Sequence, residues 1–333
     1  MVEPAGRPSV SWRLRSGWRY MRATDGLYLF NDVRRIRVNA SSSVIYALTA
    51  IIEGEQPVEY IDDQLNHILD ELCHTGVLLR GAATETAEVI SPEHRAQSAY
   101  FEGIGLDPVA ATDALTAASV LVLGLGGTGS VVLQHLVGGG IRTFALVDFD
   151  NVDPSNLGRQ FVHSRSTVGI SKLESARRYV ADRSPDANVT VISRRVESDT
   201  DVADLLKRAG SVDVAAICID TPPGRAFDLC AIELWRAGVP FIHGGVMMQT
   251  GAYGPLFSVR HSSPHPAGFG LTNERARSLE ACFSPYNTIV GAHMAAELLH
   301  HLIGGPVDYQ RRTFIDWFHS RYRKLPPVRP ERS

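Results

Sequence analysis

The stretch Ser119-Val-Leu-Val-Leu-Gly-Leu-Gly-Gly-Thr-Gly-Ser130 decides the fold of this chain. Its first five residues are typical of a buried strand, and the glycines after them fit the G-x-G-x-x-G spacing of a turn that leads into a helix. Glycine lets the backbone turn sharply and approach a ligand, while free N–H groups at a helix start attract phosphate. We therefore expect a nucleotide site here, with backbone contacts at Gly124, Gly126, Gly127 and Gly129. Ser130 stands where a P-loop NTPase needs lysine, so that alternative does not hold.

Outward from this turn, apolar strands and helical segments alternate. We expect strands near residues 120–123, 143–147, 189–192, 212–219 and 239–242, joined by helices. This alternation, with continuous Val, Ile and Leu in the strands, predicts an α/β fold with a doubly wound, Rossmann-like, mostly parallel sheet. The helix that follows Ser171-Lys-Leu-Glu174 carries an S-x-x-E spacing, which predicts a capping box that satisfies two backbone N–H groups.

The first 82 residues have a different pattern. Short alternating apolar stretches predict small strands up to residue 38, the runs from Ser41 and Ile61 predict two or three helices, and residues 77–79 predict a closing strand. Residues 83–97 are small, polar and acidic, which favours a linker. We therefore expect a small α+β winged-helix domain at 1–82, a linker at 83–97 and the larger α/β domain at 98–333.

Composition narrows the class of protein. The 333 residues are 44% hydrophobic, enough for a sizeable core, and the net charge of -3 favours neither nucleic acid nor an anionic membrane as partner. The four cysteines never form a C-x-x-C pair, which argues against a zinc ribbon or a disulfide framework. No apolar stretch is long enough for a membrane span and no secretory signal is visible, so we expect a cytoplasmic protein.

Polar and charged residues gather after the second strand of the larger domain. They are Asp148, Asp150, Asn156, Arg159, Gln160 and Lys172. Asp148 lies where an acidic residue binds ribose hydroxyls in this architecture, which alone would also suit an NAD-dependent dehydrogenase. Arg159 and Lys172 favour a triphosphate instead, because departing pyrophosphate spreads charge that cations must stabilise. Surface ion pairs of these two cations with Asp150 and Glu174 are the structural alternative.

Asp220 follows the apolar strand expected at 212–219, at the carboxyl edge where doubly wound sheets bind ligands. A carboxylate together with phosphate oxygens is the usual way in which proteins hold Mg²⁺. The sequence therefore makes Asp220 a candidate magnesium ligand. The alternative is that Asp220 caps the helix that begins near Pro222.

The motifs G-x-G-G-x-G at 124–129, D-x-D-x-V-x-x-S-N-x-x-R-Q at 148–160 and V-G-x-x-K at 168–172, followed by Asp220, resemble the ubiquitin-activating-enzyme superfamily in its ThiF/MoeB/HesA branch. The resemblance covers about residues 95–305. It implies an adenylyltransferase that uses ATP and Mg²⁺, with Asp148 on the ribose, Asn156, Arg159 and Lys172 on the triphosphate, and Asp220 on the metal. It also implies a homodimer in which an arginine enters the partner's site, for which Arg95 is the nearest candidate.

The N-terminal segment resembles the PqqD-like peptide-recognition domain of ribosomal peptide maturation enzymes. Together the two resemblances imply ATP-dependent adenylation of a peptide or small-protein carboxylate in bacteriocin-like peptide biosynthesis, with the peptide bound by residues 1–82 and companion maturation enzymes as possible partners. Two alternatives remain. One is a non-catalytic scaffold that delivers a leader peptide to a cyclodehydratase, and the other is a sulfur-carrier-protein adenylyltransferase.

The chain departs from that family at several cysteine positions. The zinc-binding C-x-x-C pairs are absent, with His265 between prolines in their place, so we expect no zinc. Cys282 is a candidate nucleophile or, alternatively, a small packed hydrophobe, while Cys218 and Cys230 are expected in the core. His243 ends a strand and either lines the substrate pocket or has a structural role.

Overall fold

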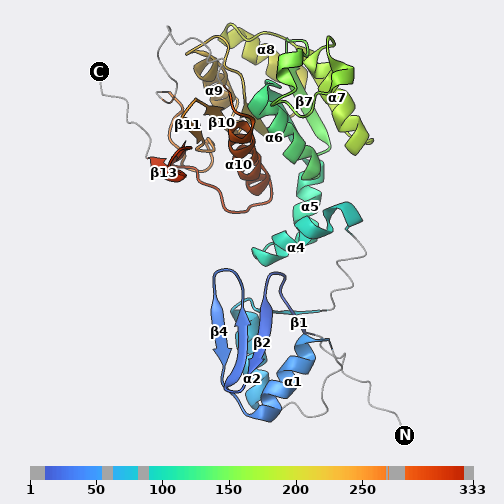
Figure 1. The fold of residues 1–333 in the computed structure, drawn as a ribbon, viewed down its shortest axis with the longest axis vertical. Helices are drawn as coiled ribbons and strands as arrows, with labels where there is room; N and C mark the ends of the chain where they lie inside the picture. Colours follow the sequence, from blue (N-terminus) through green and yellow to red (C-terminus); the bar gives the residue numbers. More distant parts are fainter. Residues whose placement is uncertain (1–11, 55–62, 82–89, 268, 270–281, 326–333) are drawn as a thin grey trace. The chain divides into compact units, whose positions relative to one another are not determined.

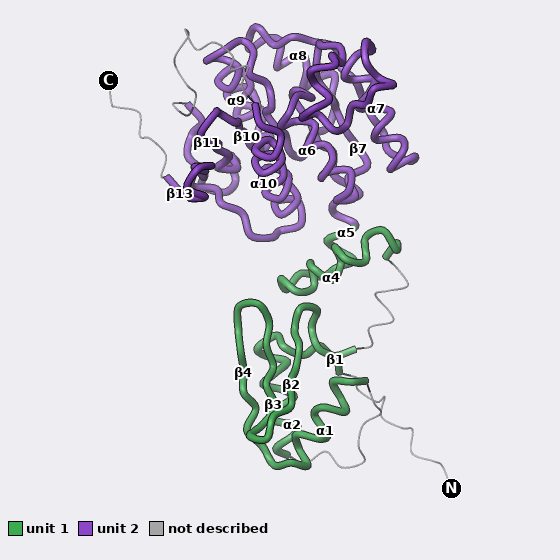
Figure 2. The backbone as a smooth tube through the Cα atoms, viewed as in Figure 1, with its two compact units in different colours: residues 1–112 green, residues 113–333 purple. Residues whose placement is uncertain are grey.

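The computed structural model describes residues 12–54, 63–81, 90–267, 269 and 282–325. The chain divides into two compact units, residues 1–112 and 113–333, and the boundary falls within α5 (Pro108–Ala117) (Figure 2). No helix in the described ranges is both long and apolar enough to cross a bilayer.

The N-terminal unit combines two small sheets with two helices (Figure 1). Its elements before residue 82 are β1 (Trp12–Leu14), β2 (Arg19–Ala23), β3 (Gly26–Phe30), β4 (Arg35–Val38), α1 (Ser42–Ile52), α2 (Asp63–His74) and β5 (Leu78–Arg80). Strands β2, β3 and β4 form an antiparallel meander, and β1 pairs with β5. Leu27 and Leu29 of β3, Leu48 of α1 and Leu65 of α2 are fully buried and form the core, as the alternating and helical spacings predict.

The predicted linker at 83–97 is only partly within the described residues, because 82–89 lie outside them. Its second half forms the 3₁₀ turn η1 (Pro92–His94) and the start of α4 (Arg95–Gly103). Glu102 of α4 accepts hydrogen bonds from Arg13 and Ser16, including one of 2.9 Å from the Ser16 backbone N–H. Helix α4 is therefore tied to the N-terminal unit, and the predicted domain boundary at 97 stays a prediction.

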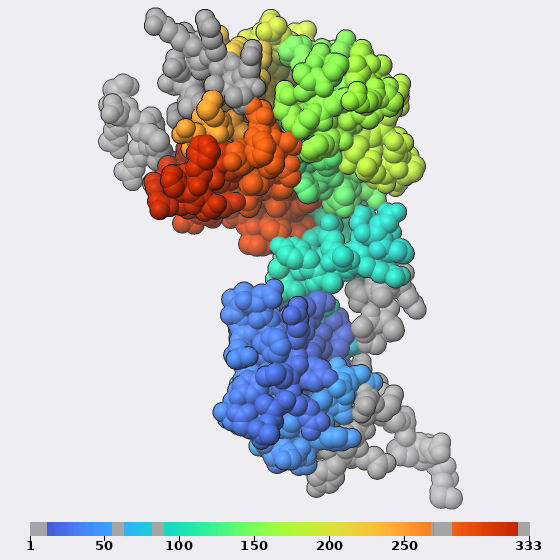
Figure 3. All heavy atoms as spheres, in the orientation of Figure 1, coloured from blue at the N-terminus to red at the C-terminus, as the bar shows by residue number. Residues whose placement is uncertain are grey.

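The larger unit is built on an eight-stranded sheet in the order β13-β12-β11-β10-β9-β6-β7-β8. Strands β6 (Ser119–Leu123), β7 (Thr143–Asp148), β8 (Asn188–Ser193), β9 (Val214–Ile217) and β10 (Phe241–Val246) are parallel. Strands β11 (Thr250–Tyr253), β12 (Arg312–Asp316) and β13 (Arg321–Leu325) extend it antiparallel. The predicted α/β, mostly parallel architecture is confirmed. Strand β13 is exposed along its length and contributes to the red surface in Figure 3.

Helices cover both faces of this sheet. Helices α6 (Gly127–Gly138), α7 (Lys172–Arg183) and α10 (Ser284–Leu302) lie on one face, and α8 (Asp199–Ala209) and α9 (Ala226–Arg236) lie on the other (Figure 1). The short 3₁₀ turns η2 (Pro154–Asn156) and η3 (Arg165–Thr167) connect β7 to α7. Strand β6 is buried at every residue, as expected of a strand between two helical layers. Because β6 lies between β9 and β7, its carboxyl end is the topological switch point where ligands bind in such sheets.

The capping box expected at Ser171 is only half formed. Ser171 Oγ accepts the Glu174 N–H at 3.1 Å and caps α7, as predicted. The Glu174 carboxylate does not return to Ser171 and instead pairs with Arg177 and Arg178. Two guanidinium groups one turn away therefore compete successfully for the carboxylate, and the second predicted contact is wrong.

Candidate active site

The glycine loop between β6 and α6 leaves no space for a Cβ at Gly124, Gly127 or Gly129. Gly124 has a φ of +93°, and a Cβ there would lie 2.7 Å from the Cys218 carbonyl oxygen. A Cβ at Gly129 would lie 2.0 Å from the Gly124 carbonyl oxygen, and one at Gly127 would lie 2.7 Å from Asn287 Oδ1. Close packing of this loop against β9 and α10 thus explains three of the four glycines. Gly126 is the N-cap of α6, so the first N–H groups of that helix are free of side-chain caps.

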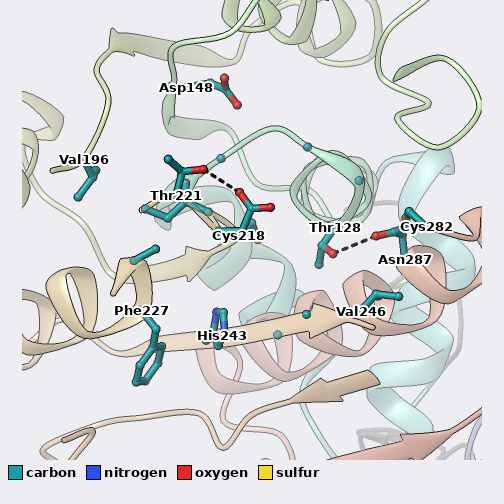
Figure 4. Close-up of a pocket in the computed structure, with 18 of the residues that line it drawn as sticks. Thr128, Asp148, Val196, Cys218, Thr221, Phe227, His243, Val246, Cys282 and Asn287 are labelled. Atoms are coloured by element: carbon teal, nitrogen blue, oxygen red, sulfur yellow. Dashed lines mark hydrogen bonds between the residues drawn. The ribbon is translucent and has the colours of Figure 1, made fainter. Parts of the chain in front are cut away.

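A cavity of about 640 Å³ lies over this loop. It brings together most of the side chains and glycines that the sequence singles out: Gly124, Gly126, Gly127, Asp148, Asp150, Asn156, Arg159, Gln160, Lys172 and Asp220. Gly129 is not in its wall, because it packs under the loop. Arg95 is an exposed residue of the N-terminal unit and does not line the cavity. In Figure 4, Asp148 lies on one side of the cavity and His243 on the other.

Asp148 is held by backbone N–H groups at the end of β7. Its Oδ2 accepts the Leu125 N–H of the glycine loop at 2.7 Å, and its Oδ1 accepts the N–H groups of Phe149 and Asp150 at 2.8 and 2.9 Å. The residue is 7% exposed. These bonds fix the carboxylate beside the loop, which is where an acidic residue for ribose hydroxyls is expected.

Two cations lie at the same end of the cavity. Lys172 Nζ is 2.9 Å from Asp150 Oδ2, and the lysine side chain is buried while the aspartate is half exposed. Arg159 Nη1 donates to the Ser155 carbonyl oxygen at 2.9 Å, and no carboxylate among the described residues pairs with it. The alternative of surface ion pairs therefore names the right partner for Lys172, which is Asp150. Glu174 pairs with neither Lys172 nor Arg159.

Asn156 and Gln160 form the wall beside these cations. Asn156 Oδ1 accepts the Asp153 N–H at 3.0 Å, which fixes its amide in the capping box of η2. Gln160 is 3% exposed, and its Oε1 is buried without a hydrogen-bond partner within the described structure. Such an unpaired acceptor destabilises the protein by roughly 1–3 kcal/mol unless a donor reaches it, and a bound nucleotide has hydroxyl and amine donors. This orphan acceptor fits the predicted ligand.

Asp220 lies beyond the end of β9 and is exposed to the cavity. Among the described residues, Thr221 Oγ1 is the one group that donates a hydrogen bond to its carboxylate, at 3.2 Å, so an oxygen remains available. The helix-cap alternative is wrong, because α9 begins at Ala226 and Arg225 is its N-cap. No cluster of three or more metal-ligating side chains occurs among the described residues, so a cation here would take the remaining ligands from phosphate and water.

The opposite end of the cavity contains residues for which the sequence predicts no definite role. His243 lines the cavity and its Nδ1 lies 3.0 Å from the Ile217 carbonyl oxygen, so the ring has the structural contact that one alternative predicts, while a role toward substrate stays a prediction. Burial and the positive charge of Arg312 outweigh the Ile217 hydrogen bond, which raises the pKa of His243, and lower that pKa to about 4, so the ring is neutral at pH 7. Arg312, Phe314 and Phe269 also line this end and belong to no motif. The β11–β12 register brings Arg312 and Phe314 there.

The cysteines differ in their surroundings. Cys230 is buried, as predicted, and burial raises the pKa of its thiol to about 12. Cys218 lies just past the end of β9 and lines the cavity, so the expectation that it lies in the core is wrong. Burial nevertheless raises the pKa of its thiol to about 12. Cys282 is exposed at the cavity and accepts a hydrogen bond from Asn287 Nδ2. His265 packs edge-on against Trp235 with ring centroids 5.3 Å apart.

The fold and the cavity define a Rossmann-type α/β protein with a glycine loop at its switch point. The chain belongs to the ThiF family, whose model matches residues 97–333. The resemblance drawn from the motifs is therefore confirmed for the larger unit. The PqqD-like resemblance of the N-terminal segment stays a prediction.

Curated relatives share the core of the chain. The molybdopterin-synthase adenylyltransferase of Salmonella typhimurium is 35% identical over 152 residues, 46% of this chain and 58% of that protein. The adenylyltransferase and sulfurtransferase UBA4 of Kluyveromyces lactis is 33% identical over 202 residues, 59% of this chain and 43% of that protein. The chain thus spans about half the length of these relatives.

Solved structures match nearly the whole chain in fold. E. coli MccB with ATP has a TM-score of 0.78 at 20% identity, covering 96% of this chain and 98% of that one. The microcin C7 biosynthetic enzyme MccB with N-formylated MccA has a TM-score of 0.76 at 19% identity over the same shares. At these identities the likeness establishes the fold alone.

Proposed function

We propose that this chain is an adenylyltransferase that activates the carboxylate of a peptide or small protein with ATP. The observation that carries the proposal is the juxtaposition of Lys172, Arg159 and the glycine loop at one end of a cavity that continues past Asp220. The names of the curated relatives support this activity, since both are adenylyltransferases.

The reaction requires one bond to form and one to break. A carboxylate oxygen attacks the α-phosphorus of ATP, a C–O–P linkage forms, and the α–β bond breaks with its electron pair leaving on pyrophosphate. Asp148 accepts hydrogen bonds from the ribose, while Arg159 and Lys172 bind the phosphates and stabilise the charge that develops on the leaving group. Because the attacking carboxylate is already an anion, no residue has to act as a general base.

Mg²⁺ is proposed as the accompanying ion, with Asp220 as its protein ligand. When bound, the ion neutralises phosphate charge. Asp150, Asn156 and Gln160 complete the nucleotide end of the cavity. An arginine from a second copy, for which Arg95 is the candidate, would belong to a homodimeric form of the enzyme.

For the substrate, we propose a ribosomal peptide held by the N-terminal unit, with companion maturation enzymes acting later. The match to MccB in complex with N-formylated MccA over 96% of this chain supports a peptide as the substrate. In the N-terminal unit, Arg35 and Arg37 lie over the Tyr28 ring at 5.6 and 5.9 Å, and Arg37 also pairs with Asp25, so Arg35 is the cation of this surface that we propose for an acidic peptide. The name of the Kluyveromyces relative, an adenylyltransferase and sulfurtransferase, favours a second candidate substrate, a sulfur-carrier protein.

Exchange of labelled pyrophosphate into ATP tests the proposal. The full chain is incubated with ATP, Mg²⁺ and either candidate peptides or sulfur-carrier proteins. Exchange that depends on a peptide supports the peptide reading, and exchange only with a sulfur carrier selects the second candidate. No exchange with either, while a leader peptide still binds residues 1–82, would favour the scaffold alternative.

A further inference from the structure

The cavity has a second compartment on the far side of β9. Asp220 follows β9, the nucleotide end lies over β6 and β7, and the remaining wall comes from β10, β11 and β12. We call this wall the acyl compartment and define it by His243, Gly245, Ala252, Arg312 and Phe314. With a nucleotide over β6 and β7, this compartment is the remaining part of the cavity in which a carboxylate would approach the α-phosphorus.

Strand alternation determines which side chains face this compartment. A Cβ at Gly244 would meet Met294 of α10, and one at Gly251 would meet Val290 of the same helix. The next residues along, Gly245 and Ala252, therefore face away from α10 and into the cavity, and Arg312 and Phe314 share that face two residues apart on β12.

Arg312 is the one charged side chain in the acyl compartment as defined. Its Nε donates to the Gly254 carbonyl oxygen and its Nη1 to the Phe269 carbonyl oxygen, both at 3.1 Å, and its guanidinium lies 5.3 Å from the Phe269 ring centroid. Its Nη2 is buried without a hydrogen-bond partner among the described residues. A guanidinium has five N–H donors, so three remain after these two bonds.

Neither neighbouring group neutralises this cation. The two carbonyl oxygens that fix it are uncharged, and no described carboxylate lies within ion-pair distance of Arg312. His243 faces the same space and is kept neutral, in part by the charge of Arg312. A rigidly held guanidinium with free donors in an otherwise neutral wall matches a planar anion that binds in a fork, as a carboxylate does.

We propose that Arg312 binds the substrate's reacting carboxylate and orients it toward the α-phosphorus. The substrate class is then a chain that ends in a free carboxylate, and a C-terminal amide is rejected at this residue. This inference rests on the proposed function for its site, but it concerns binding and can be tested without turnover.

The test uses the full chain with α,β-methylene-ATP, which occupies the nucleotide end but cannot transfer AMP. Two pools of N-acetylated hexapeptides of random sequence serve as probes, one with free C-terminal carboxylates and one with C-terminal amides. Binding is measured by saturation-transfer NMR for the wild type, Arg312→Gln, Arg312→Lys and Arg311→Gln. Arg311 is the matched control, because it is exposed and pairs with Asp308 instead.

The wild type and Arg311→Gln are expected to bind the carboxylate pool about tenfold more tightly than the amide pool, the size of one charge-assisted contact. Arg312→Gln should lose this preference and Arg312→Lys should keep part of it, with affinity for the ATP analogue unchanged. An equal preference in Arg312→Gln, or no preference in the wild type, would overturn the inference. So would weaker binding of the analogue in Arg312→Gln, since Arg312 would then be a phosphate ligand. An Arg312-dependent preference without pyrophosphate exchange would uphold the inference and refute only the adenylation.

Discussion

Lys172 and Asp150 are linked twice, by an ion pair of 2.9 Å between Nζ and Oδ2 and by a hydrogen bond of 2.9 Å from the Lys172 N–H to the Asp150 carbonyl oxygen. The second bond fixes the start of α7 against the segment after β7, and the first keeps the ammonium group at the cavity wall. The lysine side chain is only 8% exposed, against 48% for the aspartate. Asp150 therefore holds Lys172 at the cavity wall, and in the proposed reaction a phosphate would replace it as the partner of the ammonium group.

Lys172→Ala is expected to lower kcat/KM of adenylation by about 10²-fold, the usual loss when one preorganised donor to developing charge is removed. Lys172→Arg should recover part of the rate, because the charge is kept while the geometry changes. Initial rates of pyrophosphate release measure this, with Lys207→Ala, an exposed lysine of α8, as control. Equal rates in Lys172→Ala and the control would remove Lys172 from the site.

Asp220→Asn is expected to raise the Mg²⁺ concentration needed for half-maximal activity at least about tenfold, because the ion loses its one anionic protein ligand. Titrating MgCl₂ at fixed ATP measures the shift. Asp182→Asn changes an exposed aspartate of α7 and should leave the curve unchanged. A curve for Asp220→Asn that superimposes on the wild type would show that the metal, if any, binds elsewhere.

Gly129→Ala is expected to destabilise the larger unit by about 1–3 kcal/mol, since its Cβ would lie 2.0 Å from the Gly124 carbonyl oxygen and the loop would have to move. Gly138→Ala in the same helix has nothing within 4 Å of the new Cβ and should stabilise slightly. Urea unfolding followed by tryptophan fluorescence compares the two. Equal stability of both variants would mean that the loop tolerates a side chain.

Glu102→Gln is expected to loosen α4 from the N-terminal unit. Burial raises the pKa of Glu102, but hydrogen bonds from Arg13 and Ser16 outweigh it and lower the pKa to about 2. The folded pKa is below the unfolded value near 4.3, so the stabilisation is complete above that value and is lost as the pH falls toward 2.

Hydrogen exchange of β1 and α4 amides should therefore be faster in Glu102→Gln than in the wild type at pH 7, after correction for intrinsic rates. The difference should shrink as the pH falls below about 4. Glu93→Gln, on an exposed position of η1, is the control. A difference that grows on acidification would contradict the assigned role of the carboxylate.

The sequence predicts the larger unit well because its strands are apolar throughout and its glycine turn is sterically obligatory. Gly124 and Gly129 can be recognised in the sequence, because no other residue fits where they lie. The prediction fails where side chains have a choice of partners. Glu174 could cap α7 or pair with arginines, and spacing alone does not decide which.

The acyl compartment could not be predicted for a related reason. Arg312 is separated from the glycine loop by almost the whole domain in sequence, and it reaches the cavity only because β12 pairs with β11 in one register. A shift of one residue would turn it toward α10. Conversely, Asp148, Arg159 and Lys172 come from adjacent segments after one strand, so a linear motif suffices to find them.

The central claim is that a substrate carboxylate attacks the α-phosphorus of ATP. A peptide substrate found by pyrophosphate exchange is synthesised with both oxygens of its C-terminal carboxylate as ¹⁸O and incubated with the enzyme, ATP and Mg²⁺. When the acyl group passes to a nucleophile, the bridging oxygen leaves with AMP, so mass spectrometry should find AMP that carries one ¹⁸O. Unlabelled AMP, or ADP as the nucleotide product, would contradict the account.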